Sequence, residues 1–283
     1  MAFRKGKEAL GEFQVVVCVK AVPDPKQSHL IRIDPVTRCV VREAAPLVLN
    51  PLDRHALEEG LRVRERFGGR VSVVSMGPPQ AREVLREALS LGADEAYLLS
   101  DRAFAGADAY ATAYTLSLGI RRLDPFQLIL CGAESSDGST AQVGPGLAQF
   151  LGVPHVVYVD RLDLEGNDRA LARARMDHGF RLVEVDLPAL VTVTREINRP
   201  RGITFSGVVR ARNRTITEWG AADLGAEPEK VGAAGSPTVI ADLYPVESRR
   251  QAEIWEGEAE EAVRWLRQRL QDRGLLSRLG LIS

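Results

Sequence analysis

Short apolar runs alternate with amphipathic helical stretches between residues 13 and 159, and this alternation limits the possible folds more than any other feature. The runs are short and β-prone, as expected of strands covered on both faces, and they occupy residues 13–22, 70–75, 93–99, 127–131 and 154–159. Helical patterns fill the intervals, at residues 53–67, 80–91 and 108–123 and in a stretch ending near Leu151. Strands joined through helices cross over right-handedly onto a parallel sheet. The pattern therefore predicts an α/β fold with a doubly wound, mostly parallel sheet.

The pattern changes after residue 160. Residues 161–194 alternate apolar and polar side chains and carry turn signals at 165–167 and 177–179. This favours an antiparallel meander added to the sheet edge. A hairpin around residues 34–37 and a short helix near residues 203–211 are also expected.

Residues 128–145 join a strand to a helix through a loop of small polar side chains. Gly132 and Gly138 allow tight turns and leave no side chain to block a ligand. Pro145 fits the first helical turn, so the helix should begin no earlier than about Thr140 or Ala141, with Ser139 or Thr140 as its cap. The N–H groups of this turn would then point over the carboxyl end of the sheet, where phosphates bind in open α/β folds.

An ordinary strand-to-helix turn has the same composition, and this stretch alone does not separate the two possibilities. A helix N-terminus contributes about 1 kcal/mol to holding an anion, whereas micromolar affinity needs about 8 kcal/mol. Other loops must therefore contribute to any nucleotide site.

The C-terminal sixty residues have a different character. Residues 225–245, rich in Gly, Ala, Pro and Ser, are typical of an exposed extended arm. An amphipathic helix is expected at 253–271, with Trp255, Val263, Trp265 and Leu266 among its apolar residues. We therefore expect a nucleotide-binding α/β domain over residues 1–224 and an arm plus helix over 225–283. The arm could fold back on the domain, but its length favours contact with a partner subunit.

Composition excludes several classes of function. The formal net charge of −1 argues against nucleic-acid binding, which usually leaves a basic surplus. No apolar run approaches the roughly 20 residues that span a bilayer, and residues 1–13 lack the apolar core of a signal peptide. Cys18, Cys39 and Cys131 form no C-x-x-C pair and are expected to be reduced and mostly buried. The four histidines show no metal-ligand spacing. These features favour a cytoplasmic protein without membrane insertion.

Taken together, several motifs resemble the β-subunit of electron-transfer flavoproteins. Each motif is weak alone, but their order and spacing make the resemblance strong over residues 13–211. The motifs are Val19-Lys-Ala-Val-Pro-Asp24, Asn50-Pro-Leu-Asp-Arg-His-Ala-Leu-Glu58, Met76-Gly-Pro78, Leu91-Gly-Ala-Asp94, Gly132 through Pro145, Leu187-Pro-Ala-Leu-Val-Thr192 and Asn198-Arg-Pro-Arg201.

The resemblance implies an adenine-nucleotide α-hydrolase-like fold and a heterodimer with an α-subunit that carries a redox FAD. In shuttling members the β-subunit holds a structural AMP; in bifurcating members it holds a second FAD, which takes hydride from NADH. Residues 137–145 resemble the bifurcating pattern Asp-Gly-Asp-Thr-Ala-Gln-Val-Gly-Pro and depart from it at Ser139. Residues 101–108 also resemble that type. The expected cofactor is therefore FAD, with AMP as the alternative, and the expected partners include an acyl-CoA or other dehydrogenase.

The same resemblance assigns the site residues, each with a simpler structural alternative. Asn50 is otherwise a turn residue before proline, Asp53 a helix cap and Cys18 a packed strand residue. Lys20 would reach phosphate or be a solvated strand end, and Asp137 would brace the loop or touch a sugar hydroxyl. Four residues are assigned to the adenine and ribose end, namely Cys18, Asn50, Asp53 and Met76. The phosphate loop is assigned Gly132, Asp137, Gly138, Ser139, Thr140, Gln142, Val143 and Gly144.

Three further residues have open roles. Arg102 and Phe104 would lie near a flavin ring, or be a solvated arginine and a core phenylalanine. Phe205 would anchor a partner dehydrogenase, or be buried against the meander. We also expect Gly144→Arg to abolish nucleotide retention while the chain still folds.

Two other functions fit parts of the pattern. A stand-alone ATP-binding protein of the universal stress protein type would have a similar sheet, but such proteins tend to carry a longer Gly-x-Gly phosphate loop, which we do not find. A nucleotide-free interaction subunit would have an empty cleft. No nucleophile–His–acid triad and no redox thiol pair stand out, so redox work would need a bound flavin.

Overall fold

The computed structural model describes residues 13–30, 32–33, 40–41, 46–239, 241 and 252–278. The chain divides into two compact units, Met1–Leu243 (unit 1) and Tyr244–Ser283 (unit 2). Within the described residues, no helix has the length and apolar character needed to cross a membrane.

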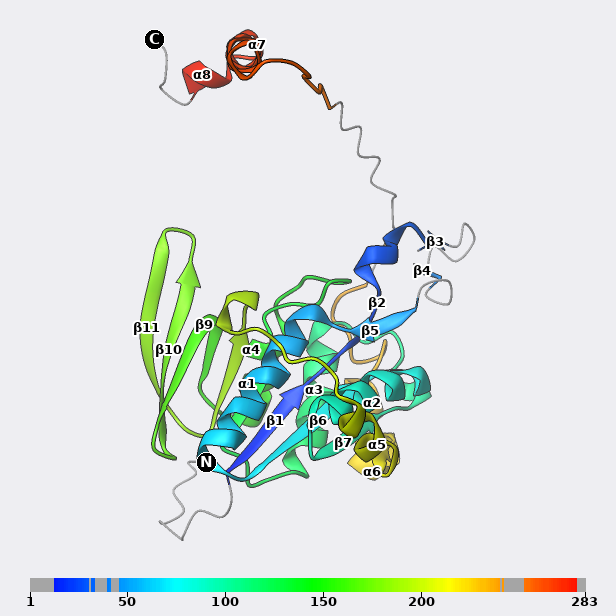
Figure 1. Cartoon of the computed structure of the whole chain (residues 1–283). Coiled ribbons are helices and arrows are strands. Elements are labelled where there is room, and N and C mark those ends of the chain that lie inside the picture. Colours follow the sequence, from blue (N-terminus) through cyan, green and yellow to red (C-terminus); the bar gives the residue numbers. More distant parts are fainter. Residues whose placement is uncertain are drawn as a thin grey trace. The chain divides into compact units, whose positions relative to one another are not determined.

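Unit 1 is built on a nine-stranded sheet of order β11-β10-β9-β12-β8-β1-β6-β7-β13 (Figure 1). Seven neighbouring strands, β9, β12, β8, β1, β6, β7 and β13, run parallel. The strands are β1 (Gln14–Cys18), β6 (Arg70–Met76), β7 (Glu95–Leu99), β8 (Leu128–Gly132), β9 (His155–Glu165), β10 (Arg169–Met176), β11 (Gly179–Asp186), β12 (Ala189–Val193) and β13 (Ile216–Trp219).

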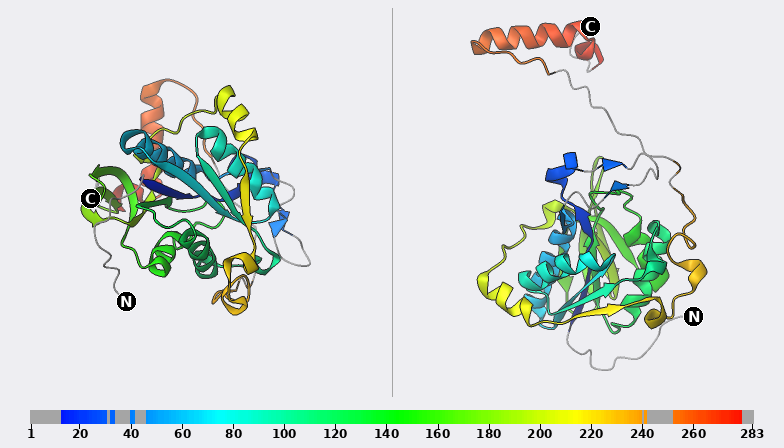
Figure 2. Two further views of the ribbon diagram at one scale, coloured as in Figure 1. Left: turned by 90° about the horizontal axis from the view of Figure 1, so that it is seen from below. Right: turned by 90° about the vertical axis from the view of Figure 1, so that its right-hand side faces the viewer.

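Helices cover both faces of this sheet (Figure 2). Along β1, Val15 and Val17 belong to one apolar cluster and Val16 and Cys18 to the other, because successive side chains point to opposite faces. The first cluster includes buried residues of α1 (Pro51–Phe67) and α2 (Arg82–Leu91), and α5 (Phe205–Arg212) packs against α2. The second includes buried residues of α3 (Ala109–Arg121) and α4 (Val143–Leu151). The predicted mixed α/β architecture with a large, mostly parallel sheet is confirmed.

The meander differs from its prediction at one strand. β9, β10 and β11 form the expected antiparallel edge. However, residues 189–193 leave the meander and form β12, which lies inside the parallel sheet between β9 and β8. The opposite edge carries β13, a four-residue strand that was not expected.

The run at residues 13–22 also forms two strands rather than one. β1 ends at Cys18, and β2 (Ala21–Pro23) pairs with β5 (Leu47–Leu49) in a separate small antiparallel sheet. The expected hairpin is present as the antiparallel pair β3 (Arg32–Ile33) and β4 (Val40–Val41). Its turn at residues 34–37 lies outside the described residues, as does Cys39.

Residues 225–238 are held on unit 1, so an extended arm does not begin at Gly225 as the composition suggested. After α6 (Ala221–Leu224), the turn Pro228–Lys230 leads to Val231, which is buried in the second cluster. Ala233 N–H donates to the Ala105 carbonyl, and Ser236 Oγ accepts the Asp108 N–H. These contacts anchor the segment beside the start of α3.

Unit 2 contains α7 (Ala259–Asp272) and α8 (Leu275–Arg278). The helix therefore begins six residues later than predicted. Trp255 precedes it and contacts Trp265 in a tilted arrangement, with 5.6 Å between the ring centroids. Val263 and Leu266, one helical turn apart, are both exposed. That unit 2 contacts a partner subunit remains a prediction.

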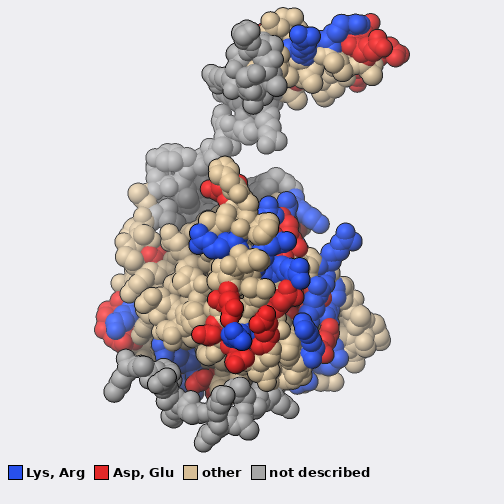
Figure 3. Space-filling view, turned by 90° about the vertical axis from the view of Figure 1, so that its left-hand side faces the viewer, with Lys and Arg blue, Asp and Glu red and all other residues tan. Residues whose placement is uncertain are grey.

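The surface of unit 1 is charged but mixed in sign. Acidic and basic side chains lie among one another on the face shown in Figure 3. On the meander, Arg169 pairs with Glu184 and Arg173 with Asp160. The meander therefore carries paired charges rather than a purely basic strip of the kind that binds nucleic acid.

Candidate functional site

The point where the strand order reverses lies between β1 and β8. From β1 the chain proceeds to β6 and β7 on one side, and then returns to place β8 on the other side. Open α/β sheets bind ligands at the carboxyl ends of the strands flanking such a reversal. Here those ends are Cys18 on β1 and Gly132 on β8, and the start of α1 lies directly beside them.

Asp53 joins these two strand ends. Its Oδ2 accepts the Lys20 N–H at 2.8 Å and its Oδ1 accepts the Gly132 N–H at 2.9 Å. Asp53 was considered as a helix cap, but it does not have that role. The N-cap position is Asn50, and both Asp53 oxygens accept hydrogen bonds from the strand ends. Burial raises the pKa of Asp53 from 3.8 to about 6, although the hydrogen bonds from Asn50, Gly132 and Lys20 offset part of this effect.

Asn50 fixes the loop that follows β8. Its side chain is 1% exposed, donates to the Glu134 carbonyl at 3.0 Å and accepts the Ser136 N–H at 3.1 Å. Its backbone N–H donates to the Lys20 carbonyl at 2.9 Å. The first turn of α1 therefore holds both the exit of β1 and the loop after β8. Contact of Asn50 with a base edge remains a prediction.

Lys20 and Asp137 form an ion pair between the exit of β1 and the loop after β8. Lys20 Nζ lies 2.7 Å from Asp137 Oδ1 and 3.4 Å from Ser135 Oγ. Asp137 therefore braces the loop, which was one of its two predicted roles. Ser135 was not singled out from the sequence, yet its carbonyl also accepts the N–H and the hydroxyl of Ser139. Its position in a run of small polar loop residues was the only available signal.

The loop before α4 has an unusual backbone. Ser139 and Ala141 both adopt left-handed conformations, with φ of 46° and 55°, which non-glycine residues rarely do and which often mark functional sites. α4 begins at Val143, which agrees with a predicted start no earlier than about Thr140 or Ala141, but its N-cap is Gln142 rather than Ser139 or Thr140. Pro145 lies in the first turn, as predicted. The N–H groups of Val143 and Gly144 therefore have no partner within the helix.

Gly144 has a packing role that the sequence did not reveal. A Cβ on Gly144 would lie 2.5 Å from Thr192 Cγ2 and 3.2 Å from Cys131 Sγ, so the first turn of α4 approaches β12 and β8 closely. Gly144→Arg would therefore strain the fold, contrary to the expectation that this variant folds normally. Gly132 is similarly enclosed, with Asp53 Oδ1 at 2.6 Å from such a Cβ. Gly138 is open, because its nearest neighbour is Ser135 Oγ at 3.5 Å.

The remaining assigned residues lie at different depths. Cys18 and Cys131 are buried free thiols at the ends of adjacent strands, and burial raises the pKa of Cys18 to about 12 and the pKa of Cys131 well above its ordinary value. Met76 is half-buried at the end of β6. Gly138, Ser139, Thr140 and Gln142 are exposed in the loop, and Val143 is half-buried.

Arg102 and Phe104 differ in burial. Phe104 is 5% exposed and belongs to the second apolar cluster, so it is a core residue. Arg102 is exposed in the short turn Arg102–Phe104 after β7. This turn is held by Asp101, which accepts the N–H groups of Ala103 and Ala221.

Phe205 is exposed, not buried against the meander. It is the first residue of α5 and 87% of its surface is accessible. Ile203 and Val209 beside it in sequence are also exposed. A docking role for this residue remains a prediction, but the buried alternative is wrong.

The donor set at the strand ends suits an anionic, phosphate-bearing ligand. It combines unpaired helix N–H groups, a lysine and exposed small side chains around one loop. No group of three or more His, Cys, Asp or Glu within the described part of the chain could hold a metal ion. The arrangement can therefore position a phosphate-bearing ligand.

Comparison with known proteins identifies relatives along most of the chain. The family model described as "Electron transfer flavoprotein domain" matches residues 38–224. An electron transfer flavoprotein subunit beta from Thermoanaerobacterium thermosaccharolyticum is 43% identical over 93% of this chain and 99% of its own length. The caffeyl-CoA reductase-Etf complex subunit CarD from Acetobacterium woodii is 45% identical over 80% and 86%, respectively. Protein FixA from Bradyrhizobium diazoefficiens is 41% identical over 83% of each chain.

Proposed function

This chain belongs to the electron transfer flavoprotein family as a β-subunit with an electron-transfer role, and we propose that its cleft between β1 and β8 holds FAD. The stand-alone ATP-binding and nucleotide-free alternatives are not favoured, because the relatives are named as subunits of electron-transfer flavoproteins and their complexes. The doubly wound sheet supports our proposal of an adenine-nucleotide α-hydrolase-like fold.

One observation carries the proposal: contacts within the chain itself hold the loop from Gly132 to Val143 in place. Asn50 and Asp53 hold its beginning, the Lys20–Asp137 pair braces its middle, and α4 presents free N–H groups at its end. A preorganised loop of small side chains is what a diphosphate needs, since its oxygens take many backbone donors.

The sequence of the loop favours FAD over AMP. The segment Asp137-Gly-Ser-Thr-Ala-Gln-Val-Gly-Pro145 resembles the bifurcating pattern at every position except Ser139. The substitution removes a carboxylate, but Ser139 still forms the left-handed turn.

The chain's own residues bind and orient the cofactor. FAD, when bound, supplies hydride and single-electron chemistry. Lys20 would neutralise charge beside the phosphates, and the N–H groups of Val143 and Gly144 would donate to them. Asp53 fixes the two strand ends next to which the cofactor would lie. Reduction by NADH, assembly with the α-subunit and transfer to or from a dehydrogenase complete the proposed role.

The test is the identity of the nucleotides in the purified heterodimer. The chain is co-expressed with its α-subunit, the complex is denatured, and the released nucleotides are separated and quantified. Two FAD per heterodimer support the proposal; one FAD with one AMP assigns AMP to this cleft. Released ATP, or no nucleotide beyond the α-subunit's FAD, would contradict it.

A matched pair of variants locates the site. Lys20→Gln should reduce retention of the second nucleotide, whereas Lys230→Gln, which disrupts an exposed Lys–Glu pair away from the loop, should not. Equal retention of the second nucleotide by both variants would show that Lys20 does not contact the phosphates.

A further inference from the structure

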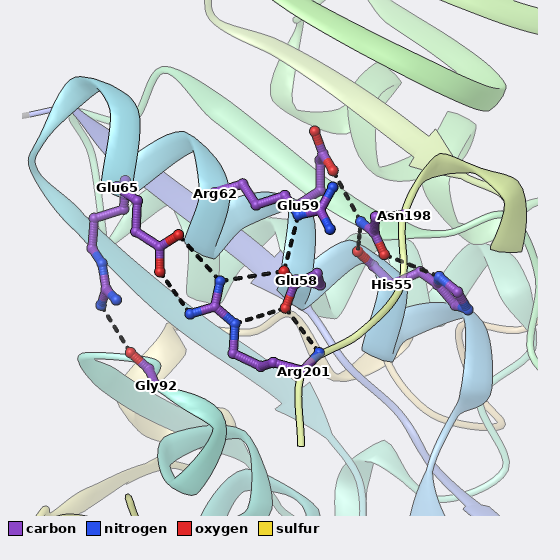
Figure 4. A network of polar contacts seen from close by, with 9 residues as sticks. His55, Glu58, Glu59, Arg62, Glu65, Gly92, Asn198 and Arg201 are labelled. Carbon is purple, nitrogen blue, oxygen red and sulfur yellow. Dashed lines mark hydrogen bonds and ion pairs between the residues drawn. The ribbon is translucent and has the colours of Figure 1, made fainter. Parts of the chain in front are cut away.

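The connection between β12 and α5 is irregular in backbone yet firmly attached to α1. After the short turn Arg195–Ile197, residues 198–204 form no helix or strand. Two side chains of this connection, Asn198 and Arg201, reach across to α1 (Figure 4). The connection ends at Phe205, the exposed residue proposed above to contact a partner.

Arg201 binds two carboxylates of α1 at once. Its Nε and Nη2 donate to Glu58 at 2.7 and 3.2 Å, and its Nη1 and Nη2 donate to Glu65 at 2.6 and 3.3 Å. The Arg201 N–H adds a third bond to Glu58 at 3.1 Å. Glu58 and Glu65 lie seven residues apart, so two turns of one helix face hold a single guanidinium.

The electrostatics identify Glu58 as the stronger of the two anchors. Its side chain is 6% exposed, against 52% for Glu65. Burial alone would raise the pKa of Glu58, but hydrogen bonds from Arg201 and Arg62 outweigh it and keep the pKa below its ordinary value. Glu58 therefore stays ionised, and Arg201 is its link to the connection.

Asn198 supplies a second attachment one helical turn away. Its Nδ2 donates to the His55 carbonyl at 3.0 Å and to Glu59 Oε2 at 2.9 Å, and its Oδ1 lies 3.1 Å from His55 Nδ1. Burial raises the pKa of Glu59, partly offset by the Asn198 hydrogen bond. The connection is thus fastened to α1 at residues 198 and 201.

The other side of Phe205 is fastened as well. Thr204 caps α5 by accepting the Gly207 N–H at 3.1 Å. A Cβ on Gly207 would lie 2.2 Å from the Ser90 carbonyl oxygen, so α5 sits directly on the end of α2. Phe205 therefore projects from between two anchors, Arg201 and Gly207, although its own side chain has almost no support.

We infer that Arg201 is a positioning residue: by joining Glu58 to Glu65 it holds Phe205 in the geometry in which the partner dehydrogenase binds it. An unattached connection would have to order on docking, and that entropy cost would weaken binding. The inference rests on the proposed docking role of Phe205. It adds that the docking side chain is preorganised from α1, the same helix whose first turn shapes the nucleotide loop.

The experiment measures electron transfer between the full heterodimer and the dehydrogenase with which the unaltered complex exchanges electrons. Arg201→Gln should raise KM for that dehydrogenase about tenfold with kcat and flavin content unchanged, and hydrogen exchange in residues 198–209 should accelerate. Glu65→Gln, which leaves the buried Glu58 pair in place, should raise KM less. Arg201→Lys, which keeps the charge without the two-pronged geometry, should recover only part of the loss.

Arg62→Gln is the matched control, because Arg62 pairs with the same Glu58 oxygen at 2.9 Å but does not touch the connection. Its KM should equal that of the unaltered protein. Combining Arg201→Gln with Phe205→Ala should raise KM no further than Phe205→Ala alone. A normal KM for Arg201→Gln alongside a raised KM for Phe205→Ala would overturn the positioning role alone. A normal KM for Phe205→Ala would instead show that Phe205 does not contact the dehydrogenase, and the docking role on which this inference rests would be wrong.

Discussion

Asp53 Oδ1 accepts the Gly132 N–H at 2.9 Å, which ties the first turn of α1 to the last residue of β8, 79 positions later in the chain. The other oxygen of Asp53 holds Lys20 just beyond the end of β1. One buried carboxylate thus sets the spacing of the two strand ends between which the proposed nucleotide lies. An ionised carboxylate accepts at both oxygens, whereas an amide accepts at only one.

The pKa of Asp53 leads to a pH-dependent stability. Its pKa is about 6 in the folded chain and 3.8 as the ordinary reference, so between these values the folded state holds a proton that the unfolded state has lost. The free energy of unfolding should therefore fall by about 1.4 kcal/mol per pH unit as the pH rises from about 4 to about 6, or about 3 kcal/mol in all, from this group alone.

Denaturant unfolding of the wild type and of Asp53→Asn across that range checks the prediction. The difference in the free energy of unfolding between the two proteins should fall with rising pH at the predicted slope, because the contributions of all other titrating groups cancel. A difference that stays flat between pH 4 and pH 6 would show that Asp53 titrates normally.

The Lys20–Asp137 pair should matter more for binding than for stability. Lys20 is 43% exposed, and such a pair contributes at most about 1 kcal/mol to folding. Lys20→Gln removes the positive charge from the cleft and should weaken FAD binding about tenfold, whereas Asp137→Asn leaves that charge available to a phosphate and should weaken it less. Calorimetric titration of the nucleotide-depleted heterodimer measures both. Equal losses for the two variants would mean that the pair acts only as a loop brace.

Alanine substitutions at Gly144 and Gly138 should distinguish a packing role from a ligand-contact role. Gly144→Ala forces a methyl group toward Thr192 Cγ2 and should cost about 1–3 kcal/mol of stability through overpacking. Gly138→Ala meets only Ser135 Oγ at 3.5 Å, so the melting temperature should hardly change. If Gly138 borders the phosphates, its added methyl should still reduce nucleotide retention. Melting curves and nucleotide content measured together decide this, and a destabilised Gly138→Ala would contradict the description of an open loop position.

Periodicity and turn chemistry predicted the parallel sheet, the crossing helices and the position of the loop, because those signals are local. They did not predict what each loop residue touches. Asp53 has the sequence context of a helix cap, but its partners are strand ends elsewhere in the chain. Gly144 has the context of a ligand loop, yet the residue that excludes a side chain there is Thr192 on β12.

The same limit applies to whole strands. Residues 189–193 form a short, fully buried run, Ala-Leu-Val-Thr-Val, rather than an alternating one, but such a run does not indicate which strands it pairs with. They enter the parallel sheet because β8 offers a buried edge beside them. β13 is too short, at four residues, for alternation to be detected, and its pairing with β7 is also long-range.

Unit 2 should be dispensable for folding and required for assembly. Unit 1 contains both apolar clusters, whereas the α7 helix of unit 2 has exposed Val263 and Leu266. A chain ending at Leu243 should keep the melting temperature of unit 1 but fail to co-purify with the α-subunit. In the full chain, Val263→Ser with Leu266→Ser should weaken that association at least about tenfold. Normal co-purification of the shortened chain would show that unit 1 alone binds the α-subunit.

Phe205 should contribute to docking without contributing to folding. A side chain that is 87% exposed makes few contacts within its own chain, so Phe205→Ala should leave the free energy of unfolding within about 0.5 kcal/mol of the wild type. A buried aromatic anchor in an interface is worth about 2 kcal/mol, so KM for the partner dehydrogenase should rise on the order of thirtyfold with flavin content unchanged.

Phe180 on β11 supplies the matched control for this last prediction, because it is also an exposed phenylalanine, at 63%. Phe180→Ala makes the same substitution at an exposed phenylalanine on the edge strand β11, and its KM for the dehydrogenase should stay normal. Equal rises in both variants would mean that partner binding responds to total apolar surface rather than to the α5 position. A rise confined to Phe205→Ala would place the dehydrogenase contact at the start of α5.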